Sequence, residues 1–356
     1  MTRRGIVGVL TCGLGLGLGV SAGAARGPTD AQLAGQRITW PVDGPRVSPA
    51  LRAAIGRGEV GSVILFARNA PSRRALRRLT TQVQAVPRPA GLDAPLLVMV
   101  DQEGGLVKRL PWAPPAMSAA RMGAALGTAG IRAQGAATGR ALRAGGITAD
   151  LAPVCDVARR GGDLARDGRA FGADVATVSM ACTAFARGLG DARVAAAPKH
   201  FPGFGRARVN TDDAVVRVTA SRAVLEREMQ PFRAAIRAGA PMVMVSSIVF
   251  PALSPRPALL SRPVVEGLLR GDLGFTGVTI TDAIDTPALR PWGGTAGASA
   301  AAAAAGMDLV IVATSEAEAR TAVRGVARAI ADGRIRRGDA QAALERVMAL
   351  RRALAG

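Results

Sequence analysis

The sequence predicts an α/β fold, a single (β/α)8 barrel of the TIM type, over residues 25–356. Short apolar runs bounded by Gly, Pro or Asp alternate with longer Ala/Arg/Leu stretches of helical period. There are eight such runs, the number that a closed parallel barrel requires. A doubly wound open sheet is the alternative, but no glycine fingerprint follows the first run. Neither a linker nor a shift in composition divides the chain, so we expect one domain.

Each expected strand is a short run rich in aliphatic and β-branched residues that ends at a turn-forming or polar residue. In chain order the runs are 37–40, 63–66, 96–100, 148–152, 194–197, 242–245, 278–281 and 309–312. Helical periodicity marks the segments between them, because apolar residues recur there every three or four positions. The expected helices include 49–57, 73–86, 129–144, 176–188, 222–238 and 262–269, with a terminal amphipathic helix over 339–355.

Residues 1–24 predict a secretory signal peptide. Arg3 and Arg4 precede an apolar stretch over 6–20, and Ala22-Gly23-Ala24 offers the small residues of a cleavage site. We therefore expect export, to a secreted, periplasmic or cell-wall location. The apolar stretch falls short of the ~20 residues that a spanning helix needs. No later stretch is long enough either, so no transmembrane segment is expected.

The chain is strongly basic, with 46 Lys+Arg against 26 Asp+Glu and a formal net charge of +20. Such a balance is typical of proteins that meet nucleic acid, a membrane surface or an acidic cell wall. Nucleic acid is disfavoured as a partner, because the arginines are spread along the chain and there is no Tyr to stack on bases. We expect a weak, salt-dependent electrostatic association with an anionic cell wall.

Two cysteines, Cys155 and Cys182, remain after the leader is removed. In an oxidising compartment they can form a disulfide, and two buried thiols packed as small apolar residues are the alternative. Together with the single histidine, His200, they cannot complete a four-ligand zinc site without carboxylates at unusual spacing. Neither a metal nor a cofactor is predicted.

Polar residues follow five of the expected strands, at the ends that a barrel uses for its site. Because polar residues recur at the same end of five strands, we expect them to form one shared site rather than separate positions in the core. They are Asp101 after 96–100, Asp156 and Arg169 after 148–152, Lys199 and His200 after 194–197, Ser246 and Ser247 after 242–245, and Asp282 after 278–281.

Five segments resemble family 3 glycoside hydrolases, specifically their single-domain β-N-acetylglucosaminidases, also called β-N-acetylhexosaminidases. They are Asp101-Gln-Glu-Gly-Gly-Leu-Val-Lys-Arg109, Leu151-Ala-Pro-Val-Cys-Asp156, Gly168-Arg-Ala-Phe-Gly172, Lys199-His-Phe-Pro-Gly-Phe-Gly205 and Gly274-Phe-Thr-Gly-Val-Thr-Ile-Thr-Asp282. The resemblance implies a barrel and a carbohydrate substrate. That substrate is terminal β-linked N-acetylglucosamine in cell-wall (peptidoglycan) fragments or chitooligosaccharides.

The resemblance also implies roles for individual residues. Asp282 matches the catalytic nucleophile, a carboxylate that attacks an anomeric carbon and forms a covalent glycosyl-enzyme. Charged groups with fixed geometry suit the hydroxyls of a sugar, and the matching sugar-binding positions are Asp101, Arg109, Arg169, Lys199 and His200. The residues alone leave other roles open: a helix N-cap for Asp282, an ion pair for Arg169 and a packed core position for His200. A turn is the alternative for Asp101, and Glu103 fits a structural role.

The match fails in the loop that carries the proton-transfer group. The family has an Asp-Ser-His segment whose histidine is the general acid/base, and here the segment is Asn210-Thr211-Asp212. Asp212 stands in place of the histidine, and Asn210 stands in place of the aspartate that assists it. The neighbouring Asp213 offers a second carboxyl group, so the loop can present either aspartate. A solvated acidic loop is the alternative for both.

Two functions follow from this departure. If Asp212 is the acid/base, the chain is a retaining glycoside hydrolase, and its carboxylate disfavours an anionic acceptor such as phosphate. If the loop no longer transfers protons, the chain is a catalytically impaired sugar-binding barrel. Phe204 and Leu106, which replace a histidine and an arginine of the family pattern, leave another specificity such as β-glucosidase open. We favour the active enzyme, because the nucleophile and the sugar-binding residues all persist.

Overall fold

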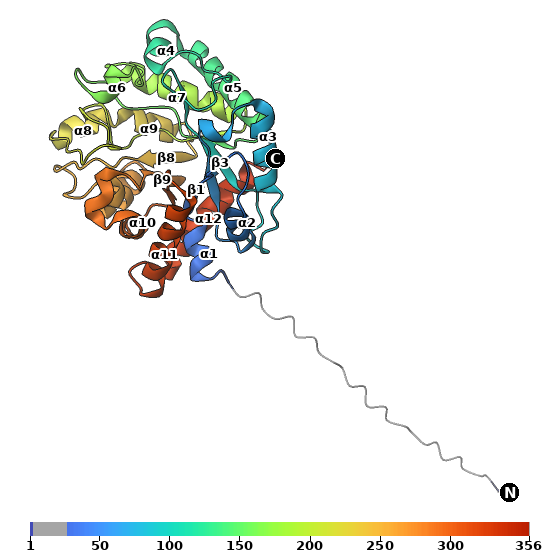
Figure 1. The fold of residues 1–356 in the computed structure, drawn as a ribbon. Helices are drawn as coiled ribbons and strands as arrows, with labels where there is room; N and C mark the ends of the chain where they lie inside the picture. Colours follow the sequence, from blue (N-terminus) through green and yellow to red (C-terminus); the bar gives the residue numbers. More distant parts are fainter. Residues whose placement is uncertain (3–26, 356) are drawn as a thin grey trace.

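The computed structural model describes residues 1–2 and 27–355 of the chain. The predicted signal peptide, 1–24, lies outside the described residues except for Met1 and Thr2. From Gly27 onward, helices surround a central set of strands (Figure 1).

Eight parallel strands form the centre of the fold, in the spatial order β7-β6-β3-β2-β1-β10-β9-β8. Backbone hydrogen bonds from Phe201 to Met244 and from Ser246 to Phe201 join the two ends of the sheet. The sheet therefore closes into a barrel, which confirms the predicted fold class and excludes the open sheet. The strands are β1 (Ile38–Pro41), β2 (Ser62–Ile64), β3 (Leu97–Val100), β6 (Ala149–Asp150), β7 (Ala195–Ala196), β8 (Met242–Val245), β9 (Val278–Ala283) and β10 (Leu309–Ile311).

Serine side chains start many of the helices, because each accepts a hydrogen bond from a backbone N–H of the first turn. None of the described helices is long and apolar enough to cross a membrane. The helices are α1 (Asp30–Gly35), α2 (Pro49–Gly56), α3 (Arg73–Gln84), α4 (Ala119–Ala125), α5 (Thr128–Ala144), α6 (Asp163–Arg166), α7 (Val175–Asp191), α8 (Arg222–Glu228), α9 (Gln230–Arg237), α10 (Gly294–Ala305), α11 (Glu316–Ala331) and α12 (Arg337–Ala353). Shorter turns are the 3-10 segments η1 (Ala67–Asn69), η2 (Ala258–Leu260) and η4 (Pro287–Trp292) and the π-helical η3 (Pro263–Asp272).

The structure differs from the expected elements at two places. Strands β6 and β7 are each two residues long, and the pairing of the two segments resumes beyond them in an isolated bridge between Val154 and Lys199. The helix expected over 222–238 divides at Met229 into α8 and α9. Pro231 explains this division, since it has no N–H to continue the helical hydrogen bonds.

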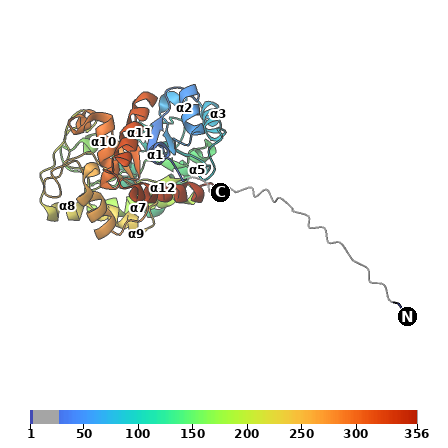
Figure 2. The same cartoon turned by 90° about the horizontal axis from the view of Figure 1, so that it is seen from below.

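Apolar side chains from the strands pack together inside the barrel. Residues of alternate strand positions, such as Met99, Met244 and Ile280, form one buried cluster. Helix α12, which runs along the lower edge of the molecule in Figure 2, packs Val347 and Leu350 against this cluster. The barrel is therefore closed at the end where its strands begin, and a site must open at the other end.

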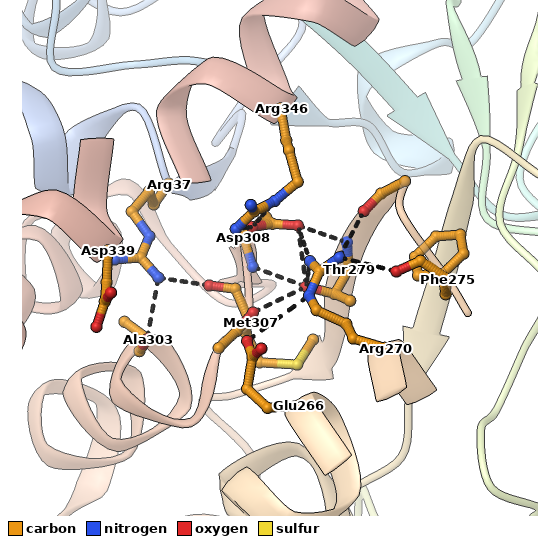
Figure 3. A network of polar contacts seen from close by, with 12 residues as sticks. Arg37, Glu266, Arg270, Phe275, Thr279, Ala303, Met307, Asp308, Asp339 and Arg346 are labelled. Carbon is orange, nitrogen blue, oxygen red and sulfur yellow. Dashed lines mark hydrogen bonds and ion pairs between the residues drawn. The ribbon is translucent and has the colours of Figure 1, made fainter. Parts of the chain in front are cut away.

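A buried ion network stabilises that closed end (Figure 3). Asp308, which precedes β10, is fully buried and accepts hydrogen bonds from Arg270 of η3 at 2.6 Å and from Arg346 of α12 at 2.8 Å. It also accepts from the backbone N–H of Thr279 in β9 at 2.9 Å. The carboxylate of Asp308 thus joins η3, α12, β9 and the start of β10 at the base of the barrel. This is the end opposite to the one where a barrel binds its substrate.

Cys155 and Cys182 form a disulfide, so of the two alternatives the bridge is confirmed. The disulfide ties the loop after β6 to α7, and the Cys155 N–H donates to the carbonyl of Lys199 at 2.6 Å. Asp156 is the next residue along this loop. The cross-link therefore holds the segment that carries one of the polar strand endings.

Candidate active site

The C-terminal ends of the strands surround a cavity of about 440 Å³. Some of the residues that line this cavity were missed by the sequence analysis, among them Phe66, Asp167, Asp285 and Thr314. Phe66 and Thr314 closely follow β2 and β10, so the rule that strand ends build the site could have found them. Ser246 and Ser247 also follow a strand, but they are buried outside the cavity. The predicted site residues all line it: Asp101, Arg109, Arg169, Lys199, His200, Asn210, Asp212 and Asp282.

Lys199 joins two carboxylates at the floor of the cavity. Its buried Nζ lies 2.7 Å from Asp101 Oδ1 and 2.8 Å from Glu103 Oε1. Arg169 forms a two-pronged hydrogen bond with Glu103, at 2.8 and 2.9 Å. Burial raises the pKa of Glu103, but the cationic Lys199 and Arg169 outweigh it and hold that pKa at about 2. Glu103 does not line the cavity, and as expected it has a structural role: it fixes two cations that do.

His200 is held by a carboxylate behind it. Its Nδ1 lies 2.7 Å from Asp156 Oδ2, and its backbone N–H donates to the same oxygen at 3.0 Å. The other oxygen of Asp156 accepts from the N–H of Phe204 at 2.6 Å. These three polar contacts fix the carboxylate of Asp156, which in turn fixes the orientation of the His200 ring. The Nε2 atom of His200 is then the ring nitrogen that can contact a ligand.

Asp282 lies near the end of β9 and lines the cavity. Its Oδ1 accepts a hydrogen bond from the adjacent N–H of Ala283 at 2.9 Å. The next helical segment, η4, begins only after Thr286, so Asp282 is not its N-cap. The structural alternative for Asp282 is therefore wrong, and its carboxylate is placed to meet a ligand.

Asp212 reaches the same cavity from the loop after β7. The side-chain oxygen of Asn210 accepts from the Asp212 N–H at 3.0 Å, and the Asn210 carbonyl accepts from the N–H of Asp213 at 3.2 Å. Asn210 therefore shapes the loop, and Asp213 does not line the cavity. Although Asp212 lies on an exposed loop, burial of its carboxyl group against the cavity raises its pKa to about 6, with added repulsion from Asp282 and Asp213.

Arg109 faces the cavity with unmet hydrogen-bonding capacity. Its guanidinium lies 5.9 Å from the ring centre of Phe66, and its buried Nε has no partner in the described part of the chain. A buried donor without a partner is unfavourable, so this group suits a ligand oxygen.

Of the two residues that replace family-pattern residues, Phe204 lines the cavity. Leu106 lies 72% exposed at the tip of the hairpin formed by β4 (Gln102–Gly104) and β5 (Val107–Lys108), outside the cavity.

Comparison with known proteins identifies the family. The family model described as glycosyl hydrolase family 3 N terminal domain matches residues 31–350. A beta-hexosaminidase of Xanthomonas oryzae pv. oryzae is 36% identical over 295 residues, which cover 80% of this chain and 86% of that protein.

Solved structures agree in fold. A family 3 β-N-acetylglucosaminidase from Paenibacillus sp. str. FPU-7 superposes with a TM-score of 0.87 and 34% identity, over 92% of this chain and 64% of that one. A β-N-acetylhexosaminidase from Beutenbergia cavernae superposes with a TM-score of 0.84 and 32% identity, over 91% of this chain and 98% of that one. The chain is therefore a glycosidase, and it belongs to glycosyl hydrolase family 3.

Proposed function

We propose that this glycosidase is a retaining β-N-acetylhexosaminidase that uses Asp282 as nucleophile and Asp212 as general acid/base. The observation that carries the proposal is the meeting of these two carboxyl groups in one cavity, one of them with its pKa raised to about 6. Retaining enzymes place two carboxyl groups roughly 5–5.5 Å apart, one ionised and one protonated. Burial and the nearby charge of Asp282 raise the pKa of Asp212, which favours the protonated form that a general acid needs.

In the first step, Asp282 attacks the anomeric carbon while Asp212 gives its proton to the leaving oxygen. The glycosidic bond breaks, the sugar remains on Asp282 as an ester, and the leaving group departs as an alcohol. Asp212, now ionised, takes a proton from water, and the resulting hydroxide oxygen attacks the anomeric carbon. Asp282 is released as a carboxylate, and Asp212 is protonated again.

The remaining charged groups of the cavity suit the hydroxyls of one sugar ring. Asp101 offers acceptors, while Lys199, Arg109 and Arg169 offer donors in fixed positions. We assign sugar binding to these four residues and to His200. Ionic contacts hold Asp101, Lys199 and Arg169 in place without a ligand, so little ordering is required when the sugar binds.

We propose terminal β-linked N-acetylglucosamine as the sugar, in cell-wall (peptidoglycan) fragments or chitooligosaccharides. The relatives named above are a beta-hexosaminidase, a β-N-acetylglucosaminidase and a β-N-acetylhexosaminidase, which supports this choice. The leader-like sequence of residues 1–24 supports export. The full sequence has a net charge of +20, and it remains strongly positive when Arg3 and Arg4 leave with the leader, which supports weak electrostatic retention near anionic wall polymers.

Hydrolysis of p-nitrophenyl N-acetyl-β-D-glucosaminide tests the proposal, with Asp282→Ala and Asp212→Ala beside the wild type. We expect Asp282→Ala to be inactive. We expect Asp212→Ala to retain the first step with this good leaving group and to be accelerated by azide, which replaces the missing base catalysis. The p-nitrophenyl β-glucoside is the matched substrate for a β-glucosidase. A preference for this substrate would overturn the assignment of N-acetylglucosamine. A wild type as silent as Asp282→Ala that still binds N-acetylglucosamine would show a sugar-binding barrel instead.

A further inference from the structure

Helix α3 has a strongly basic outer side. Its exposed arginines are Arg73, Arg74, Arg77 and Arg78, and we call them the arginine face. The opposite side of the helix is buried in the core. Helix α3 lies on the outside of the barrel (Figure 1). The four side chains border an open trough of about 620 Å³ together with Thr81 and Gln82.

The arginine face is electrostatically unfavourable for the helix that carries it. Arg73 and Arg77 are four residues apart, as are Arg74 and Arg78, and like charges at this spacing repel. Arg73 and Arg74 also occupy the first turn, where the helix dipole favours anions. No acidic residue lies in α3, and none of the four arginines forms an ion pair with a described carboxylate.

Other helices of this chain pair only some of their arginines, since Arg237 of α9 and Arg328 of α11 form no ion pair with a described carboxylate. Arg222 pairs with Glu226 one turn later in α8, and Arg336 pairs with Asp339 at the start of α12. Helix α3 differs from these helices because it has four exposed arginines within six residues and no acidic residue. An anionic partner that lies along the helix would supply the missing compensation.

Helix α3 follows β2 and η1 in the chain, so it begins at the end of the barrel where the cavity opens. The Arg73 guanidinium stacks 5.1 Å from the ring centre of Trp112, and the neighbouring Arg68 stacks 4.6 Å from Phe66. Phe66 is itself part of the cavity wall. A chain bound along α3 would therefore bring attached or adjacent sugars to the mouth of the cavity.

We propose that the arginine face is a docking site for a soluble phosphodiester-linked polyanion of the cell wall, which holds the enzyme beside its substrate. Guanidinium groups bind phosphate through two parallel hydrogen bonds, and four of them on successive turns suit a repeated charge. A membrane surface fits less well, because the apolar side of α3 is already buried in the core. The choice of a wall polymer rests on the proposed export, whereas the binding itself does not depend on the proposed catalysis.

Binding to synthetic poly(glycerol phosphate) at low ionic strength tests this proposal. The test variant replaces Arg73, Arg74, Arg77 and Arg78 with Gln. The control variant makes the same change in net charge at four scattered, exposed arginines that form no ion pair with described carboxylates: Arg52, Arg187, Arg237 and Arg328. Thermal unfolding and hydrolysis of the p-nitrophenyl substrate check that each variant is folded.

We expect the test variant to lose affinity about tenfold or more, and the control to change by less than about threefold. The test variant should melt at or above the wild-type temperature, because its arginines no longer repel. An equal loss in both variants would overturn the proposal in favour of net charge alone. Equally strong, α3-dependent binding of poly-L-glutamate would overturn the phosphate assignment. Tighter α3-dependent binding to phosphatidylglycerol vesicles than to the polymer would assign the face to a membrane.

Discussion

The Nδ1 atom of His200 lies 2.7 Å from Oδ2 of Asp156, a carboxylate that is itself fully buried. Asp156 also accepts the backbone N–H groups of His200 and Phe204. The only histidine of the sequence is therefore buried, as a core residue would be, and it also lines the cavity. It is a cavity residue whose orientation is set by a second residue, which the sequence analysis noted as a strand ending without assigning it a role.

Replacing Asp156 with Asn should lower kcat/KM by about 10- to 100-fold, because the amide presents a donor where three N–H donors converge. If Asp156 acts through His200, the double variant Asp156→Asn/His200→Asn will be no worse than His200→Asn alone. A double-mutant cycle in kcat/KM measures this. Fully additive losses would contradict the positioning role, and thermal unfolding of each variant separates it from a general loss of stability.

Activity should fall as pH rises through about 6. Asp212 must be protonated to act as the acid, and its raised pKa keeps the proton bound below about pH 6 and loses it above. The kcat/KM profile should therefore have a basic limb near pH 6. Asp212→Asn should remove that limb.

The neighbouring Asp213 provides a matched control. Its charge contributes to the raised pKa of Asp212, but it does not line the cavity. Asp213→Asn should therefore keep activity at low pH and shift the basic limb to lower pH. An unchanged limb in Asp212→Asn would show that another group supplies the proton.

Phosphate should not replace water as the acceptor in this enzyme. After the first step Asp212 is ionised beside the glycosyl-enzyme, so its charge repels an incoming phosphate. We expect the wild type in phosphate buffer to release N-acetylglucosamine and no sugar phosphate. Asp212→Asn removes the charge at nearly constant volume, and with the p-nitrophenyl substrate it should form some N-acetylglucosamine 1-phosphate. Product analysis by mass spectrometry decides, and sugar phosphate from the wild type would contradict this mechanism.

Much of the fold could be predicted from the sequence, because each element depends on local pattern. The alternation of apolar runs and helical segments fixed the strand number, and polar residues such as Asp101 and Asp282 marked the strand ends. Local pattern could not predict that Lys199 joins Asp101 to Glu103, since 98 residues separate Lys199 from Asp101. Such contacts depend on which strands become neighbours in the closed barrel.

Composition also concealed one feature of the surface. An excess of arginine throughout the chain made every basic segment look alike, so the arginines of α3 carried no special weight. Their significance depends on the lack of an ion pair between Arg74 or Arg78 and any described carboxylate, which only the folded chain reveals. The leader over residues 1–24 and the roles of the two aspartates remain predictions.

The base of the barrel should tolerate loss of a charge far less well than its surface. Asp308 is fully buried between Arg270 and Arg346, and its removal leaves two guanidinium groups without their carboxylate. We expect Asp308→Asn to lower the free energy of unfolding by about 3–5 kcal/mol. Asp332→Asn breaks a pair with Arg334 that solvent screens, so it should cost far less than Asp308→Asn. Urea unfolding measures both, and equal costs would contradict the central role of Asp308. Because the cavity lies at the opposite end of the barrel, folded Asp308→Asn enzyme should keep its kcat/KM within about twofold.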